Sequence, residues 1–192
     1  MARPATQLLS TNERAIEWAQ QVAIVVGASL FVAICARVTV PLPFTPVPLT
    51  LQNLGVLLVG LTLGSRRGFA ALALYLIEGA SGMPVFNPAG PGGVAQILGV
   101  TGGFLIAYPF VAWLAGRVME SGKKTFARGF TAGLLAEILL FAGGLSWLAA
   151  LTHSFSMAVR YGLYWFVFAE VIKIMFAAGI ATGWERAYKG QA

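Results

Sequence analysis

The sequence has little of the chemistry on which most enzymes and metal proteins depend. Its single cysteine, Cys35, has no disulfide partner and cannot build a thiolate metal site, so we expect a small buried residue. Its single histidine, His153, is too little for a zinc-protease helix or a conventional catalytic triad. We therefore expect no metal, no cofactor and no enzymatic activity from this chain.

Charge is also scarce. Only 10% of the residues are charged, whereas soluble domains have roughly 25%. In their place, 58% of the 192 residues are hydrophobic and the mean hydropathy is +0.78. A net charge of +6 would suggest a nucleic-acid partner in a soluble protein, but these basic residues separate apolar runs and are interpreted as topology signals. The composition predicts an integral protein of the lipid bilayer, with one domain over residues 1–192 and no nucleic-acid partner.

Six apolar segments predict an all-α membrane protein with six transmembrane helices. The segments are about 20–40, 49–64, 68–85, 94–116, 128–150 and 161–183. Six spans place both termini on one side of the membrane. Basic residues gather on that side: Arg3, Arg14, Arg66, Arg67, Arg117, Lys123, Lys124, Arg128, Arg186 and Lys189. Only Arg37 and Arg160 fall on the other side, so we expect cytoplasmic termini and outward connections at 41–48, 83–93 and 153–160.

The first expected helix carries small residues at a spacing of four. Ala15, Ala19, Ala23 and Gly27 fall on one face of the expected helix and form what we call the small-residue stripe. Small residues allow membrane helices to approach closely. The stripe fits two interpretations, namely packing within the protein's own bundle and docking to another membrane subunit.

The last apolar segment contains two opposite charges, Glu170 and Lys173. Three residues apart on a helix, they share one face. An ionised group at the bilayer centre costs about 2.5 to 3.5 kcal/mol, so both should face the protein interior and meet polar groups. We predict a binding site at this pair, and the simpler alternative is a structural ion pair within the helix.

Two of the expected outward connections have unusual compositions. Residues 41–52 read PLPFTPVPLTLQ, and proline at this density favours a stiff, extended segment. With Arg37, Phe44 and Gln52 close by, this segment is predicted to be a lid, although a plain spacer is the alternative. Residues 82–93 read GMPVFNPAGPGG, in which Asn87 is either an Asx-turn residue or an amide presented to a ligand, next to Phe86.

The continuous run from Ala36 to Gly116 resembles the BioY family, the biotin-specific substrate-binding subunits of energy-coupling-factor transporters. The resemblance rests on the spacing of the elements VPLTLQ, GSRRG, GMPVF and LGVTGGF. It extends to the last helix, where WFVFAEVIK (165–173) is similar to the family pattern PFxPGDxxK and places Glu170 and Lys173 at its acid and lysine positions. The chain departs from that pattern at Trp165, Phe168 and Ala169, and Glu170 is one methylene longer than the usual aspartate.

The resemblance implies a bacterial plasma-membrane protein that captures biotin from outside and does not hydrolyse ATP. Its partners would be a module of two cytoplasmic ATPase subunits and a transmembrane coupling subunit, with the small-residue stripe as the docking face. Biotin needs an acceptor, a donor, an aromatic wall and a cation. The candidates are Glu170 for the ureido N–H groups, Asn87 or Gln52 for the ureido group, Lys173 or Arg37 for the carboxylate, and Phe44, Phe86 and Trp165 for the walls.

Other functions have less support in the sequence. The segment GRVMESGKKT (116–125) lacks the spacing and the strand-to-helix context of a phosphate-binding loop. A self-sufficient secondary carrier would use Glu170, Glu137 and Lys173 as a proton relay. An intramembrane hydrolase would need a nucleophile and a base, and no such pair is visible. We expect Glu78 and Glu137 to be structural.

Overall fold

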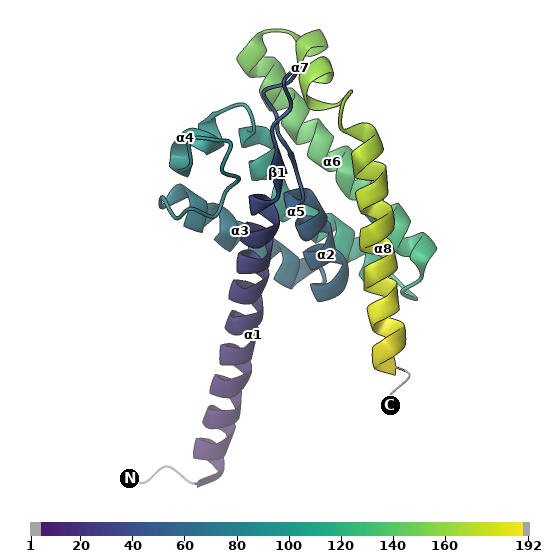
Figure 1. The fold of residues 1–192 in the computed structure, drawn as a ribbon. Helices are drawn as coiled ribbons and strands as arrows, with labels where there is room; N and C mark the ends of the chain where they lie inside the picture. Colours follow the sequence, from purple (N-terminus) through teal and green to yellow (C-terminus); the bar gives the residue numbers. More distant parts are fainter. Residues whose placement is uncertain (1–4, 190–192) are drawn as a thin grey trace.

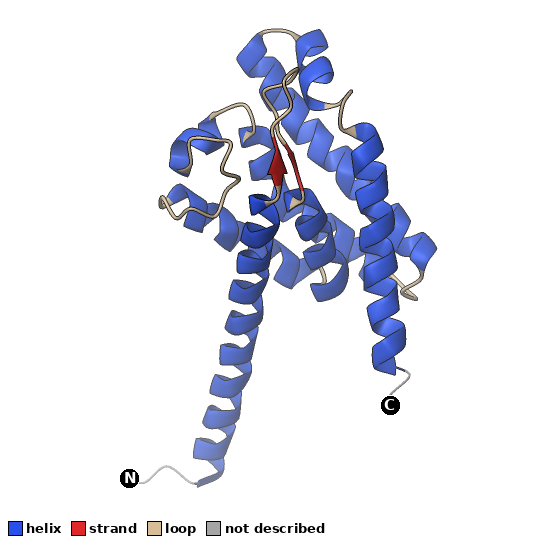
Figure 2. Cartoon of the chain, in the orientation of Figure 1, coloured by secondary structure: helices blue, strands red, loops and turns tan. Residues whose placement is uncertain are grey.

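Most of the chain is helical in the computed structural model (Figures 1 and 2). The structure describes the backbone of residues 5–189 and the side chains of residues 13–183, so Arg3 and the side chains of Arg186 and Lys189 lie outside the described part. The helices are α1 (Ala5–Arg37), α2 (Gln52–Leu63), α3 (Ser65–Ala80), α4 (Gly93–Leu98), α5 (Gly102–Glu120), α6 (Phe126–Thr152), α7 (Phe155–Gly162) and α8 (Val167–Lys189). Two short strands, β1 (Thr39–Val40) and β2 (Leu49–Thr50), pair antiparallel.

Helix α5 is the centre of the bundle. It packs against α2, α3 and α6, while α8 packs against α2 and α6, and α1 packs against α2 and α3. Glycines permit the closest approaches: a Cβ at Gly60 of α2 would lie 2.5 Å from the carbonyl oxygen of Ala112 in α5. The core around α5 is therefore packed backbone against backbone, as small residues allow in membrane bundles.

By length and composition, three helices can cross a membrane: α1 over Glu13–Arg37, α5 and α6. The pair α7 and α8 gives a fourth candidate, bent by 51° at the break between them. Helix α2 has 12 residues and α3 has 16, so they are about 18 Å and 24 Å long against a hydrocarbon core of about 30 Å. The all-helical membrane fold is confirmed, whereas the number of six spans stays a prediction.

Two predicted segments are not single helices. The segment 94–116 is divided at Gly99–Thr101, where the indole Nε1 of Trp147 donates a hydrogen bond to the carbonyl oxygen of Gly99 at 2.9 Å. The segment 161–183 begins in α7 and crosses a turn at 163–166 before α8 starts at Val167. At the first break the Gly99 carbonyl bonds a side chain of α6, and hydropathy does not record such a contact.

The connections between helices lie at two ends of the molecule. The α2–α3 and α5–α6 connections, which carry basic residues, lie toward the end where the chain termini are found (Figure 1). The β1–β2 hairpin, the connection after α3 and helix α7 lie at the opposite end (Figure 1). This division matches the one used to predict the orientation, which itself stays a prediction.

Helix α1 is much longer than its contact with the bundle. It has 33 residues, and its N-terminal half extends away from the other helices (Figure 1). The small-residue stripe Ala15, Ala19, Ala23 and Gly27 is exposed, and a Cβ at Gly27 would meet nothing within 4 Å. The opposite face is buried through Ala28, Val32 and Ala36. The interpretation of the stripe as packing within the protein's own bundle is therefore wrong.

The contrast between Gly60 and Gly27 gives a test of the packing. We expect Gly60→Ala to lower the melting temperature by several degrees, because overpacking a core costs about 1 to 3 kcal/mol and the obstacle is backbone. The matched variant Gly27→Ala should leave the melting temperature unchanged or raise it, since alanine favours a helix by about 1 kcal/mol over glycine. Thermal unfolding in detergent measures both, and equal effects would contradict the packing of α2 on α5.

Candidate functional site

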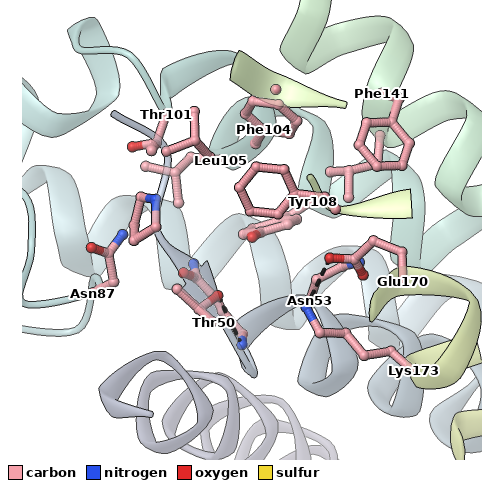
Figure 3. Close-up of a pocket in the computed structure, with 16 residues that line it drawn as sticks. Thr50, Asn53, Asn87, Thr101, Phe104, Leu105, Tyr108, Phe141, Glu170 and Lys173 are labelled. Carbon is pink, nitrogen blue, oxygen red and sulfur yellow. Dashed lines mark hydrogen bonds and ion pairs between the residues drawn. The ribbon is translucent and has the colours of Figure 1, made fainter. Parts of the chain in front are cut away.

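A cavity of about 60 Å³ lies beneath the β1–β2 hairpin, between α2, α5, α6 and α8 (Figure 3). It is smaller than the usual small-molecule site of about 300 to 1,000 Å³. Its polar side chains are those of Thr50, Gln52, Asn53, Asn87, Thr101, Tyr108, Glu170 and Lys173. The cavity combines an apolar lining with a few converging polar groups, which is typical of a ligand site.

Glu170 and Lys173 form an ion pair inside the bundle. The Nζ of Lys173 lies 2.8 Å from Oε1 of Glu170, and each residue is only 7% exposed. Both line the cavity from the first turns of α8. The prediction that the two charges share one face and point inward is confirmed. The two side chains form an ion pair and also line the cavity, so a structural ion pair does not exclude a role in ligand binding. That role stays a prediction.

Asn53 joins this ion pair to a second carboxyl group. Its Nδ2 donates to Oε2 of Glu170 at 2.7 Å and also to Oε1 of Glu137. Asn53 lines the cavity and is 4% exposed, and Glu137 of α6 is equally buried. The resulting polar cluster connects α2, α6 and α8 through the middle of the bundle. Sequence reasoning missed Asn53 and gave Glu137 no partner.

Gln52 and Asn87 both lie at the cavity as predicted. The Nε2 of Gln52 donates to the hydroxyl of Tyr75 at 2.9 Å, and that hydroxyl donates to the carbonyl oxygen of Val85. Gln52 therefore supports the connection after α3. Asn87 is 5% exposed and its Oδ1 has no hydrogen-bond partner in the described part of the protein. This buried, unpartnered acceptor favours the presentation of the amide to a ligand over an Asx turn.

Four of the predicted site residues are absent from the cavity lining in the described structure. The rings of Phe44 and Trp165 contact each other at a tilt of 41° with centroids 4.2 Å apart, and both are about half exposed. Phe86 is buried against Tyr75, with ring centroids 5.3 Å apart, and Arg37 is exposed at the end of α1. Their prediction as direct walls or as the carboxylate partner finds no support in this geometry, because neighbouring side chains or solvent occupy their contacts.

Most of the aromatic wall comes from helices. It consists of Phe104, Tyr108 and Phe141, together with Phe166 from the turn before α8. Phe104 and Tyr108 lie four residues apart on α5, and Phe141 lies four residues after Glu137 on α6. This spacing places each pair on one helix face and was the signal that could have identified the wall.

The proline-rich segment 41–48 covers the cavity and is fastened to the other side of its mouth. Val47 and Pro48 line the cavity. The hydroxyl of Thr45 donates to the carbonyl oxygen of Tyr161 in α7 at 2.6 Å, and the rings of Phe44 and Trp165 are also in contact. Stiff backbone and a small number of contacts across the mouth are what a lid requires.

Comparison with known proteins agrees with this geometry. A family model described as the BioY family matches residues 5–190. The chain is 37% identical over 155 residues to a probable biotin transporter BioY of Pyrococcus horikoshii, covering 80% of this chain and 90% of that protein. It is 34% identical over 157 residues to the biotin transporter BioY of Thermotoga maritima, covering 81% and 92%.

A solved structure shares the fold. The crystal structure of the S-component for biotin from an ECF-type ABC transporter matches with a TM-score of 0.75 and 23% identity, covering 96% of this chain and 95% of that one. The family model spans nearly the whole chain, and the relatives are similar over most of their own lengths. The chain therefore belongs to the BioY family.

Proposed function

We propose that this chain binds biotin and is the substrate-binding subunit of an energy-coupling-factor transporter. The observation that carries the proposal is the buried ion pair of Glu170 and Lys173 in the lining of a cavity, with the unpartnered amide oxygen of Asn87 in the same lining. Relatives described as biotin transporters support the identity of the ligand.

The cavity offers complementary groups for the ureido and thioether rings of biotin. Lys173 uses one N–H on Glu170 and has two more for the ureido carbonyl, while Asn87 Oδ1 accepts a ureido N–H. The apolar thioether ring fits against Phe104, Tyr108 and Phe141. The acid tail then points toward the mouth under the lid.

The rest of the chain suits a subunit without hydrolytic activity of its own. We place it as a single multi-pass domain in the bacterial plasma membrane, with six spans and cytoplasmic termini, following the basic connections at the end of the molecule where the termini lie. Its partners are two ATPase subunits and a transmembrane coupling subunit. The exposed small-residue stripe of α1 supports docking to the coupling subunit, because its close-packing surface has no partner within the described chain.

Equilibrium binding to the purified chain in detergent tests the proposal. Isothermal titration calorimetry should show one biotin bound per chain, with thiamine and riboflavin giving no heat beyond dilution. Biotin without measurable binding, or a control vitamin that binds equally well, would reject the ligand. Uptake by vesicles that contain this chain without any ATPase, abolished by a proton uncoupler, would instead favour a self-sufficient carrier.

A further inference from the structure

The amide of Asn53 is held in one orientation. Its two N–H groups are taken by Glu170 Oε2 and Glu137 Oε1, which belong to α8 and α6. Reversing the amide would place its oxygen against two carboxylate oxygens, which are acceptors themselves. The hydrogen-bond network therefore assigns the nitrogen to the carboxylates and leaves the oxygen for another partner.

That oxygen has no partner in the described protein. Asn53 Oδ1 is buried and makes no hydrogen bond, although Asn53 lines the cavity. Asn87 Oδ1 and Glu137 Oε2 are in the same condition, but Glu137 is not among the described residues that line the cavity. A buried carbonyl oxygen without a donor is unfavourable in a low-dielectric interior, so the two amide oxygens at the cavity favour a ligand that brings N–H groups.

We propose that Asn53 is a ligand-binding residue whose side-chain oxygen accepts a hydrogen bond from a ureido N–H, and that Glu137 positions it. This inference rests on biotin being the ligand. A cyclic urea has two diverging N–H groups, and Asn53 and Asn87 lie toward different sides of the cavity (Figure 3). Both oxygens of Glu170 already accept hydrogen bonds from Lys173 and Asn53, so the two amides provide acceptors that the protein itself does not use.

Glu137 acts through Asn53 and not on the ligand. It is 4% exposed and is not among the described residues that line the cavity. Its Oε1 accepts the hydrogen bond that Asn53 donates, and its Oε2 has no partner in the described protein. Without this acceptor, only one N–H group of Asn53 is still hydrogen-bonded, to Glu170. The amide can then rotate, so its oxygen is no longer held in one orientation.

Biotin titrations of the full chain in detergent test both roles. We expect Asn53→Ala and Glu137→Ala each to weaken binding about tenfold or more, the usual effect of losing a buried hydrogen bond. Glu137→Gln should bind within about threefold of wild type, because the glutamine oxygen still accepts from Asn53. The double variant Asn53→Ala/Glu137→Ala should bind no more weakly than Asn53→Ala alone, since Glu137 acts only through Asn53.

Glu78→Ala is the matched control. Glu78 is a half-buried acid of α3 whose partner is Ser29 of α1, outside the cavity, and its removal should leave biotin affinity unchanged. If Asn53→Ala does not give a folded, monodisperse protein, Asn53→Ser keeps a hydroxyl group at this position and should still weaken binding.

The outcomes separate this inference from the proposed function. If wild type binds biotin and a folded Asn53 variant binds equally well, Asn53 is not a ligand residue. If the losses at Asn53 and Glu137 simply add, or Glu137→Gln binds as weakly as Glu137→Ala, the positioning role is wrong. Absence of biotin binding to the wild-type chain would reject the proposed function itself.

Discussion

Lys173→Met is expected to abolish measurable biotin binding, with a loss of affinity of at least about a hundredfold. Removing one partner of a buried ion pair leaves an uncompensated charge and costs about 3 to 5 kcal/mol. Here Nζ of Lys173 lies 2.8 Å from Glu170 and both residues are 7% exposed. The variant also loses the N–H groups proposed to meet the ureido carbonyl. Calorimetry with purified protein measures the change.

Two further variants separate binding from folding. Lys123→Met removes an exposed lysine from the connection between α5 and α6 and should bind biotin like wild type. Glu170→Gln/Lys173→Met removes both buried charges, so it should recover thermal stability while remaining unable to bind. Full affinity in the folded double variant would show that the ion pair is structural only.

Replacing two alanines of the small-residue stripe with leucine is expected to reduce uptake by more than about tenfold without changing biotin affinity. Ala19 and Ala23 are exposed on α1 and lie outside the cavity lining, so binding should not respond. Leucines at both positions prevent the close helix approach that small residues permit. Uptake of labelled biotin is measured in cells that produce the chain with the proposed ATPase and coupling subunits.

The matched control for the stripe is Ala142→Leu. Ala142 is an exposed alanine of α6, and leucine there adds the same volume on another face of the bundle. It should support normal uptake and normal binding. An Ala19→Leu/Ala23→Leu protein with full uptake would show that α1 does not dock through this stripe, and a protein with weakened binding would show that the effect is not one of docking.

Parts of the fold could be predicted because hydropathy reports long, uninterrupted apolar runs. The segments 20–40 and 128–150 correspond closely to the apolar part of α1 and to α6. The breaks at 99–101 and 163–166 could not be predicted in this way. At the first, the partner of the Gly99 carbonyl is Trp147, 48 residues away in sequence, and only the folded chain brings the two together.

The site was predictable where charge stood out against an apolar background. Glu170 and Lys173 are conspicuous in a membrane helix, and Gln52 and Asn87 were found through the connections that carry them. Asn53 was missed because it directly follows Gln52, and nothing in the sequence distinguishes the second amide from the first. Its two carboxylate partners come from helices distant in sequence. The loop aromatics Phe44 and Trp165 were favoured over those of α5 and α6 because hydropathy does not distinguish aromatics that face lipid from those that face a cavity.

The length of α1 has a consequence for its relation to lipid. A helix of 33 residues is about 50 Å long, whereas the hydrocarbon core measures about 30 Å. Trp18 is exposed among Glu13, Arg14 and Glu17, a composition that suits the headgroup level, and about 29 Å of helix separate it from Arg37. The small-residue stripe therefore straddles the boundary between headgroups and acyl chains, with Ala15 and Ala19 near the former and Gly27 within the latter. Hydrophobic mismatch then sets how far this helix tilts, so that the thickness of the host bilayer adjusts the surface offered to a neighbouring subunit while leaving the vitamin cavity untouched.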